Sequence, residues 1–136
     1  MNNAELVKAF YEVIVSENRL DELDLYISDD CVQKVGEKEI HIGIIGMKKH
    51  LVALKETYPD YAMKIIRQYS DGDYVISEFI MRGTHKGEFI GIKPTNKVLE
   101  ITGVDIDKVV DGKNTEHGGA VNTFETFIEH HLVKPV

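Results

Sequence analysis

The sequence predicts an α+β fold in which helices come first and strands follow. Apolar residues recur at helical spacing through the first 60 residues, and apolar and polar residues alternate from Tyr61 onward. Asp-Gly pairs at 71–72 and 111–112 mark tight turns between strands. With 136 residues, 43% of them hydrophobic, the chain suits one compact domain over residues 1–136.

The helical patterns occupy three segments of the N-terminal part. Residues 3–16 place Leu6, Phe10 and Ile14 on one face, and Asn2 with Glu5 predicts a capping box at the start. Shorter helical patterns follow at 20–27 and 47–58, and Pro59 ends the second of them. We therefore expect residues 1–60 to be mainly helical.

The strand patterns begin at Tyr61. An alternating segment over 61–69 leads to a predicted two-residue turn at 71–72, and residues 74–89 predict a long or bent strand. Residues 98–110 and 113–121 predict a second hairpin about the loop Asp111–Gly112, and apolar spacing from Phe124 predicts a closing helix.

The second hairpin allows a register to be counted from its loop. If Val110 pairs with Lys113, then Asp107 lies opposite Glu116, Asp105 opposite Gly118 and Gly103 opposite Ala120. Because strand side chains alternate, Asp107, Asp105, Gly103 and their three partners share one face with Asn122, and His117 lies on the other. A loop one residue longer would reverse one strand's faces.

Small and polar residues together on that face predict a small-molecule pocket, or else a solvated, strongly twisted sheet face. Asp107 and Glu116 form either an acid/base pair or two exposed carboxylates near the turn.

The charge and composition exclude several partners. A formal charge of −7 and a pI near 5.3, with scattered Lys and Arg, argue against nucleic acid. No apolar run approaches the roughly 20 residues that span a bilayer, so we expect no membrane partner. A single cysteine, Cys31, and no secretory pattern at the N-terminus predict a cytoplasmic protein.

One motif carries a family resemblance. Gly83–Gly91 reads GTHKGEFIG and is followed by IKPTNK, and further matches lie at 103–108, 111–113 and 116–117. These segments resemble the signature of SnoaL-like polyketide cyclases, in the superfamily related to nuclear transport factor two. The resemblance implies a cone-shaped, curved antiparallel sheet packed against N-terminal helices. It also implies a pocket between sheet and helices, a homodimer, and cofactor-independent intramolecular aldol cyclisation.

The chain departs from the family pattern at several site positions. Asn122 stands where the resemblance implies an acid/base aspartate, and an amide has no proton to exchange near neutral pH. Gly118 replaces a tryptophan, Lys34 replaces a frequent histidine, and Lys108 replaces an arginine. Asn122 also fits a second role, as the side-chain cap of the closing helix.

Asp105 and His85 are the candidate catalytic residues. Asp105 matches the family's G-x-D-x-x-R pattern and would act as a base, with His85 or Tyr11 polarising a carbonyl. His85 is alternatively a structural histidine, and Tyr11 alternatively packs on the helix face. The candidate substrate-binding residues are Tyr11, Lys34, Gly118 and Asn122.

The leading hypothesis is a SnoaL-like protein that binds a small, apolar, oxygenated molecule, with cyclisation, isomerisation or dehydration as the cofactor-free chemistry open to it. The alternatives are a non-catalytic ligand-binding protein and a dimerisation module. The histidines show no metal-binding spacing, and the glycine and proline segment at 91–97 lacks the following helix of a phosphate site, so we expect neither a metal nor another cofactor.

Overall fold

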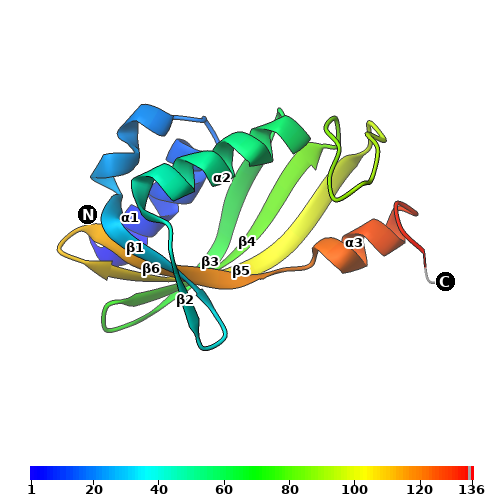
Figure 1. The fold of residues 1–136 in the computed structure, drawn as a ribbon. Helices are drawn as coiled ribbons and strands as arrows, with labels where there is room; N and C mark the ends of the chain where they lie inside the picture. Colours follow the sequence, from blue (N-terminus) through cyan, green and yellow to red (C-terminus); the bar gives the residue numbers. More distant parts are fainter. Residues whose placement is uncertain (135) are drawn as a thin grey trace.

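The helices lie along one side of a curved sheet in a computed structural model that describes residues 1–134 and 136 (Figure 1). Helix α1 (Asn3–Ala9) continues directly into the π-helical segment η1 (Phe10–Val15). A 3-10 helix η2 (Leu20–Leu25), the long helix α2 (Gly43–Thr57) and the closing helix α3 (Thr123–Glu129) complete the helical elements.

The sheet has six strands in the order β2-β1-β6-β5-β4-β3. They are β1 (Ile27–Val35), β2 (Lys38–His41), β3 (Ala62–Asp71), β4 (Tyr74–Thr84), β5 (Val98–Val110) and β6 (Lys113–Val121). The predicted α+β class and curved sheet are confirmed. The sheet is mixed rather than wholly antiparallel, because β1 pairs with β6 in parallel.

The start of the first helix follows its sequence. The Asn2 side chain accepts a hydrogen bond of 2.8 Å from the Glu5 backbone N–H, and its amide donates to the Glu5 carboxylate at 2.8 Å. In η1 the wider π-helical turn leaves the adjacent residues Phe10 and Tyr11 both buried. The helix therefore presents two neighbouring aromatic rings to the interior.

The core lies between α1, η1, α2 and the concave face of the sheet. The following residues are at most 1% exposed: Val7, Ile14, Leu23, Ile27, Val75 and Leu99. The helices thus cover the middle of the sheet, while β2 and the hairpin loops project beyond them (Figure 1). No helix among the described residues is long and apolar enough to cross a membrane.

The N-terminal part is mainly helical, as predicted, but the β1–β2 hairpin over residues 27–41 was not predicted. Only Ile27 and Cys31 of β1 are fully buried, and their spacing of four resembles a helix face. The remaining residues of β1 are polar or are valines that are not buried, so no alternation is visible.

Of the two predicted turns, one is confirmed and one is displaced. Asp111 and Gly112 form the β5–β6 loop with φ of 50° and 76°, and Val110 pairs with Lys113. In the first hairpin Asp71 pairs with Tyr74, so the loop is Gly72–Asp73 rather than 71–72. Gly72 supplies the positive φ of 58°.

Candidate active site

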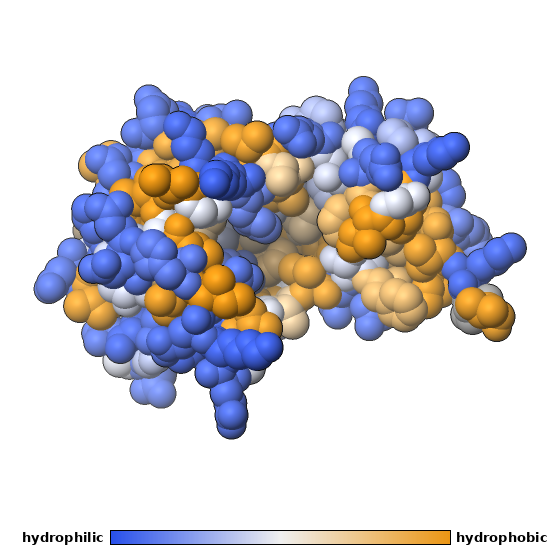
Figure 2. All heavy atoms as spheres, in the orientation of Figure 1, coloured by the Kyte–Doolittle hydropathy of each residue, from blue (hydrophilic) through white to orange (hydrophobic). Residues whose placement is uncertain are grey.

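A cavity of about 530 Å³ opens between the concave face of the sheet and the helices η1 and α2. The surface view shows a hollow near the centre of the molecule, with hydrophobic residues on its walls (Figure 2). Its apolar lining includes Phe10, Leu51, Met63, Phe79, Met81 and Ile101. A cavity of this size and lining suits a small, mainly apolar ligand.

The register of β5 and β6 decides which polar residues face the cavity. Beyond the first two pairs after the loop, the pairing shifts by one residue between Lys108 and Val109. Thr115 is the extra residue of β6, because Asn114 pairs with Val109 and Glu116 with Lys108. The predicted register was therefore wrong beyond this point.

The shift places His117 opposite Asp107, Gly119 opposite Asp105 and Val121 opposite Gly103. The predicted pair of Asp107 and Glu116 does not exist. Glu116 instead accepts a hydrogen bond of 3.3 Å from the Tyr74 hydroxyl at an exposed position. A histidine, rather than a third carboxylate, thus accompanies the two aspartates inside.

Gly103 and Gly118 were predicted to contribute to the pocket, but the structure gives both glycines packing roles. The ring of Phe79 lies where a side chain at Gly103 would project, so Gly103 adds no empty space. A Cβ at Gly118 would lie 2.9 Å from the Lys34 backbone oxygen, so this glycine allows β1 to approach β6.

Gly119 leaves the carboxylate of Asp105 accessible from the cavity. It has φ of 148°, and a Cβ there would lie 2.6 Å from Asp105 Oδ1. The bare backbone at this position leaves the Asp105 carboxylate open to the cavity.

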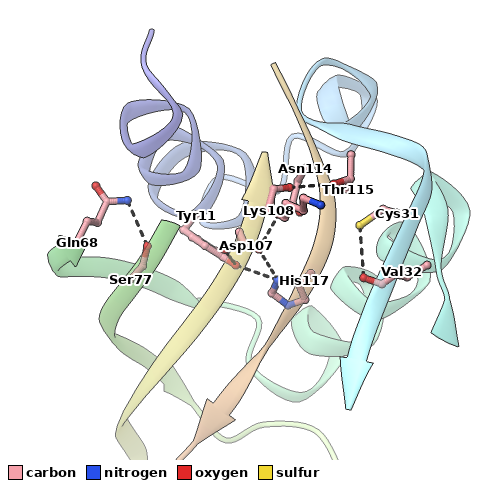
Figure 3. Close-up of polar contacts among 10 residues, drawn as sticks. All are labelled: Tyr11, Cys31, Val32, Gln68, Ser77, Asp107, Lys108, Asn114, Thr115 and His117. Carbon is pink, nitrogen blue, oxygen red and sulfur yellow. Dashed lines mark hydrogen bonds and ion pairs between the residues drawn. The ribbon is translucent and has the colours of Figure 1, made fainter. Parts of the chain in front are cut away.

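Four side chains form a polar network at one end of the cavity (Figure 3). Asp107 is fully buried and accepts three hydrogen bonds: from the Tyr11 hydroxyl at 2.8 Å, from Asn114 Nδ2 at 2.6 Å and from His117 Nδ1 at 2.8 Å. Donation from Nδ1 leaves the Nε2 atom of His117 free for a ligand. Tyr11, Asp107, Asn114 and His117 are called the polar network below.

Two groups that line the cavity, His117 and Asp105, have pKa values shifted by burial and by neighbouring charges. Burial alone would lower the pKa of His117, but the hydrogen bond and negative charge of Asp107, with the charge of Asp105, raise it to about 9. Burial and the nearby Asp107 raise the pKa of Asp105 to about 6, against the opposing effects of His117 and the Tyr11 hydroxyl.

These two pKa values set the protonation states near neutral pH. His117 is then a cation with a proton to give, and Asp105 is mainly an anion able to take one. Burial, together with the charges of Asp107 and Asp105, raises the pKa of Tyr11, which keeps its phenol neutral. An acid and a base therefore face the same cavity.

Comparisons with known proteins agree with this architecture. Residues 5–127 match the family described as SnoaL-like polyketide cyclase. This chain belongs to the SnoaL-like polyketide cyclase family. The nogalonic acid methyl ester cyclase of Streptomyces nogalater is 27% identical to it over 101 residues, which cover 73% of this chain and 75% of that cyclase.

Solved structures of other proteins share the fold. A SnoaL-like polyketide cyclase from Agrobacterium tumefaciens has a TM-score of 0.81 at 16% identity, with 98% of this chain and 99% of that chain covered. IdmH from Streptomyces antibioticus has a TM-score of 0.82 at 21% identity, with 96% and 99% covered. At these identities the likeness shows the fold alone.

Four of the residues predicted for this SnoaL-like site line the cavity: Asp105, Tyr11, Lys34 and Gly118. The Tyr11 hydroxyl is already used by Asp107. Lys34 lies 2.7 Å from Glu39 in an ion pair, with 38% of its side chain exposed, so it belongs to the rim.

His85 and Asn122 are not among the described residues that line the cavity. His85 is fully buried, with Nδ1 3.0 Å from the Thr95 hydroxyl. Asn122 is exposed and donates a hydrogen bond of 2.7 Å to the Thr102 hydroxyl. The predicted cap is wrong, since the Asn122 side chain accepts no hydrogen bond from the described backbone of α3.

His117 was not predicted as a site residue. The predicted register lacks the extra residue Thr115 and therefore places this histidine on the outer face. The Glu116-His117 pair of the family motif was the available clue, since only one of two adjacent strand residues can face inward.

Proposed function

We propose that this SnoaL-like protein is a cofactor-free enzyme that binds a small, mainly apolar, oxygenated molecule and closes a ring by intramolecular aldol addition. The observation that carries the proposal is the presence of Asp105 and His117 on the same cavity wall. They are diagonal neighbours on β5 and β6, because Asp105 pairs with Gly119 and Asp107 with His117.

In the proposed reaction the Asp105 carboxylate removes a proton from the carbon beside a carbonyl. The electron pair of that C–H bond forms an enolate, and its oxygen is stabilised by the imidazolium of His117. The enolate carbon then bonds to a second carbonyl carbon of the same molecule. The resulting alkoxide takes a proton from protonated Asp105, or from His117, which Asp105 then reprotonates. The product is therefore an isomer of the substrate, and both residues return to their starting states.

The polar network supports this role of His117. Asp107 holds Nδ1 and stabilises the positive charge, which leaves Nε2 directed to the substrate. Asn122, which lies outside the cavity, is not required. The proposal therefore replaces the acid/base aspartate that the family resemblance implied with Asp105 and His117.

The test uses Asp105→Asn and two substrates. Nogalonic acid methyl ester, the compound for which the Streptomyces nogalater cyclase is named, tests cyclisation, and exchange of the α protons of 2-tetralone in D₂O tests enolisation. Loss of the base should reduce either rate by roughly 10²- to 10⁴-fold. Undiminished rates in Asp105→Asn, or rates no higher than buffer in the wild type, would contradict the proposal.

Asn122 in place of an aspartate favours a second candidate, a ligand-binding protein without catalysis. The two candidates differ in one comparison. In an enzyme Asp105→Asn abolishes turnover and retains binding, whereas in a binding protein the wild type has no turnover and the variant changes affinity only.

We also propose a homodimer formed through the outer face of the sheet. Large apolar residues are exposed there, including Ile66 (47%), Val104 (39%) and Ile106 (45%). Ile106→Lys should separate the subunits, because a charge would be buried in the interface. Sedimentation of the wild type as a monomer at micromolar concentration would contradict this.

A further inference from the structure

Two tyrosines line the cavity and have no role in the chemistry proposed above. Tyr58 and Tyr61 line the cavity, and they are only 4% and 5% exposed. Among the described residues neither hydroxyl has a hydrogen-bond partner within the protein, in contrast to the Tyr11 hydroxyl.

These hydroxyls are not sealed inside the protein. The fully shielded polar side-chain atoms that lack a partner among the described residues are His85 Nε2 and Asn114 Oδ1. Each phenol oxygen therefore keeps some exposed surface, and both residues line the cavity. A donor that is largely buried, rigid and unpaired stabilises a ligand more than it stabilises the free protein.

The chain holds both tyrosines firmly. The Tyr61 backbone N–H donates to the Tyr58 carbonyl at 3.0 Å, and Lys55 Nζ donates to the Tyr61 carbonyl at 2.7 Å while lying 5.6 Å from the Tyr61 ring centre. The same ammonium group donates to the Ser16 carbonyl at 3.1 Å, which ties this turn to the end of η1.

The first three residues of the family signature, Gly83, Thr84 and His85, contact the same turn from the sheet. A Cβ at Gly83 would lie 2.7 Å from the Tyr58 Cβ, so only glycine allows this ring to lie against β4. The Thr84 backbone N–H and hydroxyl each donate to the Asp60 carboxylate at 2.6 Å. The ring centres of Tyr58 and His85 are 6.2 Å apart. All three motif residues thus contact the segment 58–61.

The two tyrosines and the base lie at different levels of the same cavity wall. Gly83, against which the Tyr58 ring lies, pairs with Leu99, six residues before Asp105 on β5. The Tyr61 phenol is nevertheless within the electrostatic influence of the base, since burial and then the charge of Asp105 raise its pKa. Most of the wall between the two levels is apolar, including Phe79, Met81 and Ile101.

We propose that Tyr58 and Tyr61 form a second polar subsite, which donates hydrogen bonds to a ligand oxygen other than that of the carbonyl enolised by Asp105. The preferred ligand is then an apolar ring compound that carries at least two oxygens. This inference rests on the proposed function for its account of the first oxygen. In the binding step no covalent bond changes.

The test compares two rigid probes, 2-naphthol and 2,6-dihydroxynaphthalene. The wild type should bind the dihydroxy compound about three- to tenfold more tightly, which is the typical effect of one additional neutral hydrogen bond. The double variant Tyr58→Phe/Tyr61→Phe should bind the two probes equally. Tyr69→Phe, whose hydroxyl contacts Glu78 on the exposed face, is the matched control and should keep the preference.

Three results would overturn the inference. The first is a wild type that binds neither probe or does not distinguish them, and the second is a double variant that keeps the preference. The third is a urea midpoint lowered in the double variant, because it would show that the hydroxyls already stabilise the free protein. Proton exchange of 2-tetralone depends on Asp105 and not on this comparison, so each proposal can fail without the other.

Discussion

The buried pair of Asp107 and His117 predicts an unusual dependence of stability on pH. His117 has a folded-state pKa of about 9 against an ordinary value of 6.5. Between these values the folded protein binds more protons than the unfolded chain, so the free energy of unfolding must fall as pH rises. The stabilisation is complete below pH 6.5 and is lost as pH passes through about 9.

The size of this effect follows from the difference in pKa. At roughly 1.4 kcal/mol per unit, the difference corresponds to about 3 kcal/mol of stability lost between pH 6.5 and 9. The side chain of His117 is 19% exposed and that of Asp107 is fully buried, so solvent screens the pair only weakly.

Asp107→Asn is the informative perturbation. It keeps the shape of the side chain and removes the charge that holds the proton on His117, and burial should then bring the pKa of His117 back toward or below 6.5. Urea unfolding followed by circular dichroism, at constant ionic strength from pH 6.5 to 9, measures the slope. The variant should have a much flatter profile than the wild type.

His41→Gln is a suitable control, because it removes an exposed histidine and should leave the wild-type slope intact. A wild type whose stability is the same at both ends of the range would refute the assignment of charges. So would an Asp107→Asn variant with an unchanged slope, because the proton would then be held by something other than Asp107.

Three further substitutions test the cavity. Gly119→Ala should lower stability by more than Gly36→Ala and weaken 2-naphthol binding. A Cβ would lie 2.6 Å from Asp105 Oδ1 at the first position and meet nothing within 4 Å at the second; equal urea midpoints would argue against this. Tyr11→Phe should cost about 1.5 to 3 kcal/mol, since it removes a hydrogen bond to a buried carboxylate, and an unchanged midpoint would contradict that bond. Asn122→Asp should leave the rate of 2-tetralone exchange within about twofold, because this side chain lies outside the cavity; a large gain would return the acid/base role to position 122.

The sequence predicted the elements best where local chemistry decides the backbone. The Asp111–Gly112 loop fixes two positive φ angles, and both flanking strands have the predicted bounds of 98–110 and 113–121. The cap by Asn2 is equally local. In both cases neighbouring residues determine the geometry without help from the rest of the fold.

The site was harder to predict because it depends on distant packing. No local signal in the sequence marks Thr115 as an extra residue of β6. Its bulge depends on contacts with distant segments, because Asn114 pairs with Val109 on β5 and donates its backbone N–H to the Tyr26 carbonyl. The strand β1 has no apolar alternation to reveal it in the sequence, and pairing with β6 holds it in the sheet instead. Asp105 could be found from the family motif, whereas the partnership with His117 required the register.

Because β6 contains one extra residue, the number of residues between the β5–β6 loop and the Glu-His pair decides which side chains face the cavity. Loss of the single codon for Thr115 would invert the parity of the six residues that follow in the strand. The glutamate would then enter the hollow and the imidazole would leave it. A one-residue deletion between the loop and the Glu-His pair would thus exchange a cation for an anion in the interior in one mutational event.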